Sequence, residues 1–175
     1  MRGGIFVGGA ATRMGGRPKG LLAAPSGETI VARWQRLFAE VGLPCVLVGA
    51  RAEYAQLGIP VVADEPPGAG PLGGLAGLLA GGSAIAVACD MPYVSVTLLR
   101  RLVEGPPAPI LAPRRQGRWE PLFARYDAVV LAAVRSRLAT GRLGLQGLLD
   151  EAGAEELVVS TSEWAELEDW DTLEP

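Results

Sequence analysis

Short apolar runs alternate with helix-like segments along most of the sequence, and this alternation restricts the fold more than any other feature. Four of the runs are predicted strands, at residues 4–8, 44–48, 59–63 and 84–88. Parallel strands need long crossover connections, usually helices, and these helices then cover both faces of the sheet. The sequence therefore predicts an α/β fold, a single-domain three-layer αβα arrangement of the Rossmann-like type with a mainly parallel sheet.

Helical periodicity and punctuation residues define the segments between the strands. In residues 29–41, Ile30, Trp34 and Phe38 recur at helical spacing, and Gly42 ends the pattern. The other predicted helices are residues 53–57, 71–80, 95–103, 127–139 and 146–152, and the other predicted strands are residues 109–112, 122–126 and 156–159. No repeat or linker divides the chain, and 175 residues suit one domain, so we expect one domain over residues 1–175.

The composition excludes several kinds of chemistry. The sequence has no histidine, which excludes a Ser-His-Asp triad, a Cys-His pair and a histidine-ligated zinc site. The two cysteines, Cys45 and Cys89, each lie in an apolar run and are predicted to be reduced, buried thiols. Any reaction must therefore use carboxylates, Lys, Arg, hydroxyls or backbone amides.

Charge and hydropathy also bear on partners and location. The net charge of −3 argues against a general nucleic-acid-binding role. The longest apolar stretch, residues 75–89, contains Gly81, Gly82 and Ser83 and is shorter than the ~20 residues that a membrane span needs. The sequence starts on a strand-like run with no signal-peptide pattern, so we expect a cytoplasmic protein without a membrane segment.

A glycine-rich loop, residues 8–20, follows the first predicted strand. In folds of this class, ligands lie at the carboxyl ends of strands. Glycines let backbone N–H groups approach phosphate oxygens, Arg13 can bind a phosphate with two hydrogen bonds, and Lys19, the single lysine of the chain, adds a point charge. The loop lacks a Walker A pattern. It is predicted to bind phosphates, the alternative being a basic loop without a ligand.

A second loop follows the third predicted strand. Residues 68–73 match G-x-G-x-x-G and precede Asp90 by about twenty residues, which outlines a dinucleotide-binding fingerprint. In that fingerprint the glycines follow the strand at once, whereas residues 64–67 intervene here, which argues against it. A carboxylate at Asp64 can accept hydrogen bonds from the N1–H and N2–H groups of guanine, a pair that cytosine lacks. The alternative for Asp64 is a loop-capping aspartate.

Asp90 directly follows the fourth predicted strand, in Ala-Cys-Asp-Met-Pro. Mg²⁺ prefers oxygen ligands and keeps several waters and substrate phosphates, so one carboxylate at this place can hold it. The residues alone leave a helix or turn cap as an equal alternative.

Three of these segments resemble one known family. The strand followed by GGAATRMGGRPK, the GPLGGLAGL segment and the CDMPY segment are similar to signatures of molybdenum cofactor guanylyltransferases and related nucleotidyltransferases. The resemblance implies that the first loop holds the nucleotide triphosphate. It further implies a nucleotide site formed by Phe6, Val7, Gly8, Gly9, Lys19, Asp64 and Asp90, a metal, Mg²⁺, on Asp90, and catalytic roles for Arg13, Lys19 and Asp90.

The resemblance also implies a reaction. The terminal phosphate of molybdopterin, or of Mo-molybdopterin, would attack the α-phosphorus of GTP, transfer GMP and release pyrophosphate. Arg114, Arg115 and Arg118, near a stretch similar to the family's acceptor region, either attract the acceptor's phosphate or form a solvated basic turn. Alternatives are the same reaction with CTP, a sugar-phosphate nucleotidyltransferase, and a non-catalytic GTP-binding module. Proteins that deliver or accept the cofactor are expected partners.

Three positions depart from the family pattern. Pro18 stands where the family usually has an acid before the lysine. In the C-terminal tail, Asp171 replaces an asparagine and Leu173 a proline. The tail is therefore given no function.

Overall fold

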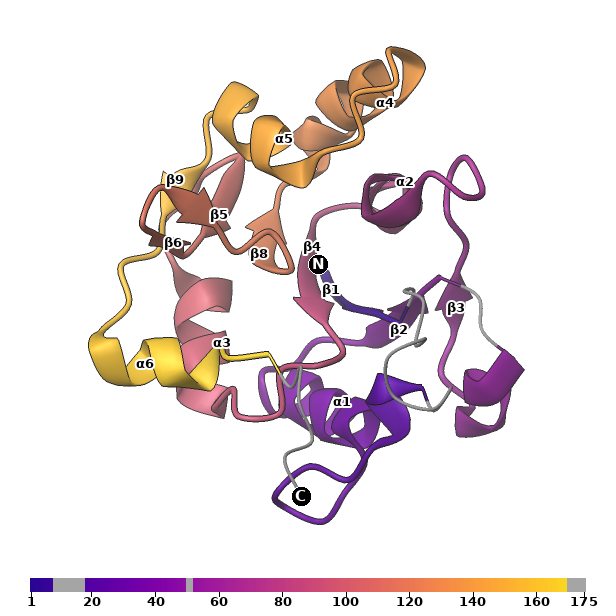
Figure 1. The fold of residues 1–175 in the computed structure, drawn as a ribbon, viewed down its shortest axis with the longest axis vertical. Coiled ribbons are helices and arrows are strands. Elements are labelled where there is room, and N and C mark those ends of the chain that lie inside the picture. The colour runs from indigo at the N-terminus through magenta and orange to yellow at the C-terminus, as the bar shows by residue number, and fades with distance from the viewer. Residues whose placement is uncertain (8–17, 50–51, 170–175) are drawn as a thin grey trace.

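The computed structural model of the chain describes residues 1–7, 18–49 and 52–169. These residues form a seven-stranded sheet with the order β3-β2-β1-β4-β8-β5-β9 (Figure 1). Its strands, in chain order, are β1 Arg2–Phe6, β2 Cys45–Val48, β3 Val61–Val62, β4 Ala84–Ala88, β5 Ile110–Ala112, β8 Phe123–Tyr126 and β9 Glu155–Glu156. A separate two-stranded hairpin pairs β6, Arg114–Arg115, with β7, Arg118–Trp119.

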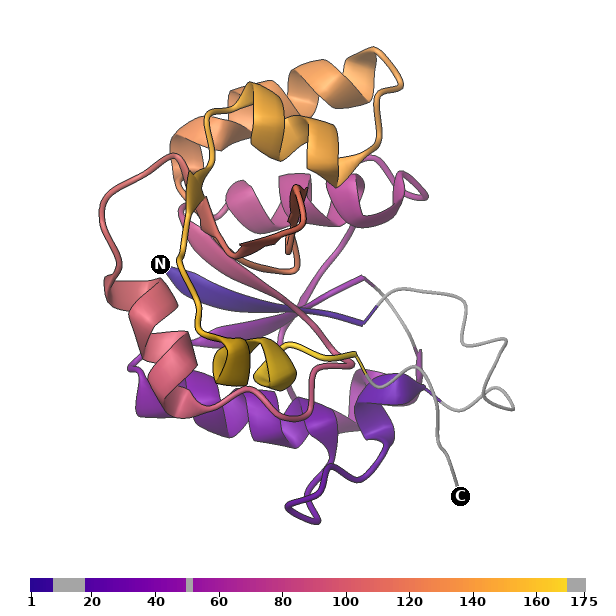
Figure 2. The same cartoon turned by 60° about the vertical axis from the view of Figure 1, so that its left-hand side comes forward.

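Helices cover both faces of the sheet, so the predicted three-layer αβα arrangement is confirmed (Figures 1 and 2). One layer contains α1, α3 and α6, and the other contains α2, α4 and α5. The α-helices are α1 Ile30–Glu40, α2 Gly70–Leu79, α3 Val96–Glu104, α4 Leu131–Ala139, α5 Leu145–Glu151 and α6 Thr161–Glu166. The 3₁₀ helices are η1 Lys19–Leu21, η2 Ala52–Leu57 and η3 Ala128–Val130. None of the helices in the described parts of the chain is long and apolar enough to cross a membrane.

Strand β1 lies at the centre of the parallel part of the sheet. Its Ile5 pairs with Leu47 of β2 on one side and Val87 of β4 on the other, in parallel register. The chain moves outward from β1 to β2 and β3, and then returns to β4 on the opposite side of β1. Such a reversal of direction opens a crevice at the carboxyl ends of the strands. Here it lies beyond Phe6 and Ala88, which are paired residues.

The strands of the second half of the sheet run in mixed directions. Strand β8 runs antiparallel to both β4 and β5, while β9 runs parallel to β5. The mainly parallel sheet is thus confirmed, with an antiparallel insertion in its second half. That half carries the β6–β7 hairpin, which the sequence patterns did not predict.

Local sequence signals account for the helix positions. The hydroxyl of Thr29 accepts a hydrogen bond from the backbone N–H of Ala32, and the hydroxyl of Ser95 accepts one from Leu98. These N-caps satisfy backbone donors that the first turns of α1 and α3 leave without partners. The buried face of α1 then packs on the sheet: a Cβ atom added at Gly3 of β1 would lie 2.5 Å from the ring of Phe38.

Two predicted strands are shorter than expected. The segment 59–63 pairs with β2 only at Val61–Val62, since it forms one edge of the sheet. The segment 156–159 forms a ladder only at Glu155–Glu156. Beyond it, Leu157 still donates to the carbonyl of Ala112, but the carbonyl of Val158 accepts from Arg101, so the chain has left the edge. Apolar runs at sheet edges therefore overestimated strand length.

Candidate functional site

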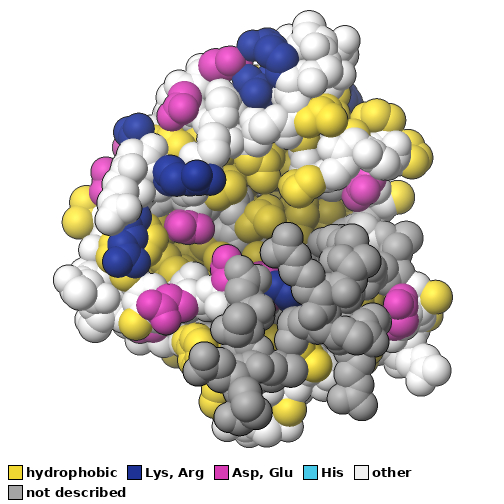
Figure 3. Space-filling view, viewed as in Figure 1, with side chains coloured by type: hydrophobic (Ala, Val, Ile, Leu, Met, Phe, Trp, Pro, Cys, Tyr) yellow, Lys and Arg dark blue, Asp and Glu magenta, His cyan; other side chains and the backbone are white. Residues whose placement is uncertain are grey.

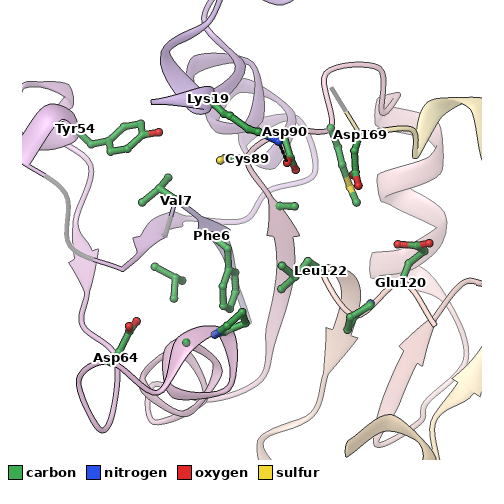
Figure 4. A pocket seen from close by; sticks show the side chains of 17 residues that line it. Phe6, Val7, Lys19, Tyr54, Asp64, Cys89, Asp90, Glu120, Leu122 and Asp169 are labelled. Carbon is green, nitrogen blue, oxygen red and sulfur yellow. Dashed lines mark hydrogen bonds and ion pairs between the residues drawn. The ribbon is translucent and has the colours of Figure 1, made fainter. Parts of the chain in front are cut away.

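A pocket of about 620 Å³ lies at the carboxyl ends of β1, β2 and β4, beside the start of α2. Figure 3 shows apolar side chains on the floor of the hollow and charged side chains around its rim. It occupies the crevice that the order of the strands opens. Its lining includes Phe6, Val7, Lys19, Val48, Tyr54, Asp64, Pro71, Cys89, Asp90, Glu120, Leu122 and Asp169 (Figure 4).

The floor of the pocket is apolar. Phe6 ends β1 and is 7% exposed, and Val7 continues the strand through a hydrogen bond from its N–H to the carbonyl of Val48. Leu122 lies on the opposite side of Phe6 from Val7 (Figure 4). Such a floor provides a surface on which a flat heterocycle can lie, because base binding by proteins relies on apolar and aromatic contact. Gly8, Gly9 and Arg13, predicted for the same site, fall outside the described residues.

Lys19 and Asp90 form an ion pair within the pocket. The Lys19 Nζ atom lies 2.9 Å from the Asp90 Oδ2 atom, and the two side chains are 26% and 21% exposed. Neighbouring contacts fix both ends. The backbone N–H of Gly20 donates to the Tyr54 hydroxyl, and the N–H of Cys89 donates to the carbonyl of Phe6, which extends the pairing of β1 and β4 to the residue before Asp90. Two charges far apart in the sequence are thus held together at a ligand-accessible position.

The surroundings of Asp90 fit a particular kind of metal site. The described residues contain no group of three or more side chains arranged to ligate a metal ion. A Mg²⁺ ion requires no such group, because it commonly takes one or two carboxylates and completes its shell with water and phosphate oxygens. Asp90 offers hard oxygen atoms inside a pocket that has room for a phosphorylated ligand. The residues present therefore fit Mg²⁺ delivered with a nucleotide.

Cys89 also reaches the pocket, yet its thiol is not positioned as a nucleophile. Its side chain is 9% exposed, and burial, together with the adjacent Asp90 carboxylate, raises its pKa to about 12. The reactive form of a cysteine is the thiolate, which such a pKa suppresses. Both cysteines are free thiols, as the sequence predicts. Cys45, which was predicted to be buried, is only half-buried, at the first residue of β2.

Asp64 lies at the edge of the pocket nearest α2 (Figure 4). Glycines bring the helix close to it: a Cβ atom added at Gly74 would lie 3.3 Å from the Asp64 Oδ1 atom. Burial raises the pKa of the Asp64 carboxyl, and no hydrogen bond from the described residues opposes that rise. A half-buried carboxylate without a protein donor is placed to accept hydrogen bonds from a ligand.

The glycines of residues 68–73 do not form a dinucleotide-binding turn. Strand β3 ends at Val62 and α2 begins at Gly70, so several residues separate the strand from the helix. Gly68 and Gly70 adopt positive φ angles of 79° and 65° in the connecting loop. Gly73 and Gly74 lie inside the helix and pack against Asp64 and its neighbours. Their role is close approach of α2 to the sheet.

A second, shallower pocket of about 590 Å³ adjoins the first and shares Glu120, Pro121 and Asp169 with it. The β6–β7 hairpin forms one wall, and Arg115 and Arg118 line it. The structure brings those two arginines to the pocket, whereas the guanidinium of Arg114 lies over the Trp119 ring, 4.7 Å from its centroid.

Helix α5 fixes the hairpin. The side-chain amide of Gln146 exchanges two hydrogen bonds with the backbone of Trp119, at 2.9 and 2.8 Å. The Trp119 indole N–H donates to Asp150 at 2.8 Å. The sequence patterns gave Gln146, Tyr54 and Asp169 no role. Their positions depend on packing between elements that no local motif records.

The structure thus brings together Phe6, Val7, Lys19, Asp64 and Asp90, five residues that the sequence places in one site. Their proposed roles remain predictions.

Comparison with known proteins shows the family to which the chain is related. Residues 3–163 match the model of a family described as the MobA-like NTP transferase domain. The molybdenum cofactor guanylyltransferase of Serratia proteamaculans is 33% identical over 162 residues, covering 89% of this chain and 82% of the relative. That of Pseudomonas putida is 36% identical over 159 residues, covering 85% and 82%.

Solved structures share the fold. A molybdopterin-guanine dinucleotide biosynthesis protein A from Archaeoglobus fulgidus superposes with a TM-score of 0.71 at 21% identity, covering 89% of this chain and 82% of that chain. A 2-C-methyl-D-erythritol 4-phosphate cytidylyltransferase from Thermus thermophilus gives 0.63 at 14% identity, covering 95% and 90%. At these identities the likeness concerns the fold alone.

Proposed function

Because the chain belongs to the MobA-like NTP transferase family, we propose that it transfers GMP from GTP to molybdopterin or Mo-molybdopterin and releases pyrophosphate. The observation that carries the proposal is the Lys19–Asp90 pair, which lies in a pocket with an apolar floor; this pocket adjoins a second one, whose lining includes Arg115 and Arg118. Curated relatives at 31–38% identity bear the name molybdenum cofactor guanylyltransferase.

The nucleotide base is proposed to lie on the floor formed by Phe6 and Val48, next to Asp64. The Asp64 carboxylate would accept hydrogen bonds from guanine N1–H and N2–H. A carboxylate matched to two adjacent donors discriminates strongly, because a base without them leaves a half-buried charge without partners. Cytosine lacks this pair of donors, which favours GTP over CTP.

The triphosphate is proposed to extend from the base toward Lys19. Lys19, Arg13 and the backbone amides of the glycine-rich loop would neutralise its charge, Arg13 and that loop being placed here by sequence alone. Asp90 would hold Mg²⁺, which when bound neutralises phosphate charge. Lys19 would then exchange its contact with Asp90 for one with a phosphate oxygen.

The transfer needs little covalent chemistry from the protein. An oxygen of the acceptor phosphate forms a bond to the α-phosphorus of GTP. The bond from that phosphorus to the oxygen bridging to the β-phosphorus breaks, and the electron pair leaves on pyrophosphate. The acceptor phosphate is already ionised, so no general base is required. The protein aligns two anions and stabilises the charge that develops, contributions that are large in such reactions.

The acceptor is proposed to enter through the second pocket. Arg115 and Arg118 line that groove, and their charges would attract an anionic acceptor toward the Lys19–Asp90 centre. Proteins that deliver molybdopterin or take up the product remain predicted partners.

Nucleotide binding followed by turnover tests the proposal. Calorimetry should give binding of GTP in preference to CTP, ATP and UTP, and stronger binding with Mg²⁺ than with a chelator. Addition of molybdopterin should then release pyrophosphate. A preference for CTP would move the proposal to the cytidylyl reaction, which shares the phosphate site. Metal-dependent GTP binding without pyrophosphate release would favour a binding module instead.

A further inference from the structure

Glu120 lies where the two pockets meet and lines both of them. Its backbone is fixed on both sides: its N–H donates to the carbonyl of Pro113 at 2.9 Å, and its carbonyl accepts from the N–H of Phe123 at 3.1 Å. The side chain is half-buried and points into the cavity (Figure 4). Glu120 lies between the end of β7 and the start of β8, and these two hydrogen bonds hold its backbone in place. Only its side chain remains free to rotate.

The Glu120 carboxylate has no hydrogen-bond donor among the described residues. Burial, and then the nearby Asp169 carboxylate, raise its pKa, while Arg118 and Arg115 act in the opposite sense without forming an ion pair to it. A desolvated carboxylate without donors is costly in a folded protein. Such a group, aimed into a cavity, is suited to accept hydrogen bonds from a ligand.

Asp64 shares these properties at the other end of the first pocket. Both carboxyls are half-buried, both have pKa values raised by burial, and neither accepts a hydrogen bond from the described residues. The Lys19–Asp90 pair lies on the upper side of the cavity between them, as Figure 4 shows. The pocket therefore has a carboxylate acceptor at each end and the phosphate-transfer centre between.

The two substrates of the proposed reaction have matching chemistry. Guanine and a pterin each carry a 2-amino-4-oxopyrimidine ring, which presents two adjacent N–H donors along one edge. A carboxylate is the side chain that can accept both hydrogen bonds at once. Resting on the proposed function, we propose that Glu120 determines acceptor specificity by accepting hydrogen bonds from this edge of the pterin.

The position of Glu120 agrees with this role. Pro121 and Leu122 follow it and provide apolar surface against which a flat ring can lie. The pterin ring would lie where the two pockets meet, and its phosphate-bearing side chain would extend toward Lys19 and Asp90. Glu120 thus distinguishes the acceptor from other phosphorylated molecules, since phosphate contacts alone carry no information about the ring.

A matched pair of ring analogues tests the inference on the full-length protein. Pterin-6-carboxylate carries the 2-amino group, and lumazine-6-carboxylate has an oxygen in its place, so that a carbonyl would face the Glu120 carboxylate. Binding of each, followed by fluorescence, should favour the pterin by about tenfold or more in the unaltered protein. In Glu120→Gln, which offers an amide in place of the charge, the preference should fall close to one. Glu120→Asp should restore part of it.

Control variants separate this role from structural or electrostatic effects. Glu156→Gln removes one exposed carboxylate from β9, outside both pockets, and should leave the pterin preference unchanged. Affinity for GTP should change much less in Glu120→Gln than the preference for the pterin does, because the guanine is proposed to lie against Asp64 at the other end of the pocket. An unchanged pterin preference in Glu120→Gln would overturn the inference, as would equal binding of the two analogues by the unaltered protein.

Two further outcomes are distinguishable. A Glu120→Gln protein that needs more Mg²⁺ for GTP binding, with its pterin preference intact, would assign the carboxylate to the metal and overturn the inference. Pterin discrimination without any GTP binding would refute the proposed function while sustaining the role of Glu120 in recognising the aminopyrimidinone edge.

Discussion

At the scale of single residues, a substitution of Asp90 tests the proposed chemistry most directly. Asp90→Asn keeps the size of the side chain and removes the charge that would hold Mg²⁺. We expect pyrophosphate release to fall about a hundredfold or more, since removing one group that stabilises transition-state charge commonly costs this much. The partly exposed pair with Lys19 should contribute only about 1 kcal/mol or less to stability.

The measurement is pyrophosphate release beside a denaturant unfolding curve for each protein. Glu156→Gln, on the surface of β9, is the control and should match the unaltered protein in both. Turnover at the normal rate by Asp90→Asn would refute the metal assignment.

Asp64 gives a second prediction at this scale. Asp64→Asn presents an amide that cannot accept two hydrogen bonds from guanine, so GTP affinity should fall by about 1–3 kcal/mol, the usual worth of a bidentate base contact. Affinity for CTP should change much less. Calorimetry with both nucleotides measures the difference. Equal losses of affinity for GTP and CTP would mean that Asp64 maintains the shape of the pocket and does not recognise the base.

The sequence predicted one part of the site better than another, for a physical reason. Asp64 and Asp90 closely follow predicted strands, and Lys19 lies near the end of the loop that follows the first one; parallel strands bring such residues to one edge of the sheet. Glu120 and Gln146 reach the second pocket through the β6–β7 hairpin and its contact with α5. That hairpin has a polar sequence without alternation, and its turn uses Gln116 at a φ of 50° followed by Gly117 at 79°. Its formation depends on tertiary contacts.

At the scale of elements, α2 approaches the sheet closely because of its glycines. A Cβ atom added at Gly77 would lie 2.2 Å from the carbonyl oxygen of Ala63, a backbone atom that can shift only together with the chain around it. Gly77→Ala should therefore destabilise the protein by about 3 kcal/mol, the upper range for overpacking. The gain in helix propensity, about 1 kcal/mol, is smaller.

The matched control is Gly144→Ala, at the N-cap of α5. Gly144 has a φ of −74°, and a Cβ atom there meets nothing within 4 Å. Its cost should stay within about 1 kcal/mol. Denaturant unfolding of both variants measures the contrast, and similar midpoints would show that α2 can move outward without penalty.

A single arginine joins the end of α3 to the sheet. The Arg125 guanidinium of β8 donates to the carbonyls of Leu102, Val103 and Gly105, and also to that of Pro106. The last carbonyls of a helix have no partners within it. Arg125→Met would leave several of them without a donor and should cost about 2–3 kcal/mol in unfolding free energy.

Arg100→Met is the comparison, because the exposed Arg100 makes one hydrogen bond of 3.5 Å, to the carbonyl of Glu40. It should change stability by no more than about 0.5 kcal/mol. The same loss in both variants would mean that the α3 carbonyls are solvated after Arg125 is removed.

At the scale of the whole molecule, the two proposed binding sites lie in different halves of the sheet. Its parallel half, β3-β2-β1-β4, ends in the pocket assigned to the nucleotide, and the antiparallel β8 begins the half that carries the groove assigned to the acceptor. Asp90 follows β4, which borders both halves. The alternation of strands and helices predicted the first half and its layers. The second half contains short strands in mixed directions, for which local patterns are weak.

This arrangement has a cost to stability that depends on pH. Burial raises the pKa of both Asp64 and Glu120, and Asp169 adds to the effect at Glu120. A carboxyl whose pKa is higher in the folded than in the unfolded state destabilises the fold once it is ionised. Its penalty is fully present at neutral pH, declines as the pH falls through the folded pKa, and is absent below the unfolded pKa.

The double variant Asp64→Asn, Glu120→Gln should therefore unfold at higher denaturant concentration than the unaltered protein at neutral pH. The difference should shrink as the pH is lowered through the raised pKa values. Other carboxyls, such as Glu163 beside Arg101, have lowered pKa values and favour the fold at neutral pH, but they are common to both proteins and cancel. A difference that is constant with pH, or that grows on acidification, would contradict the assignment. Stability gained by removing two pocket carboxylates would indicate that they are retained for binding, as functional sites often are at some cost to the fold.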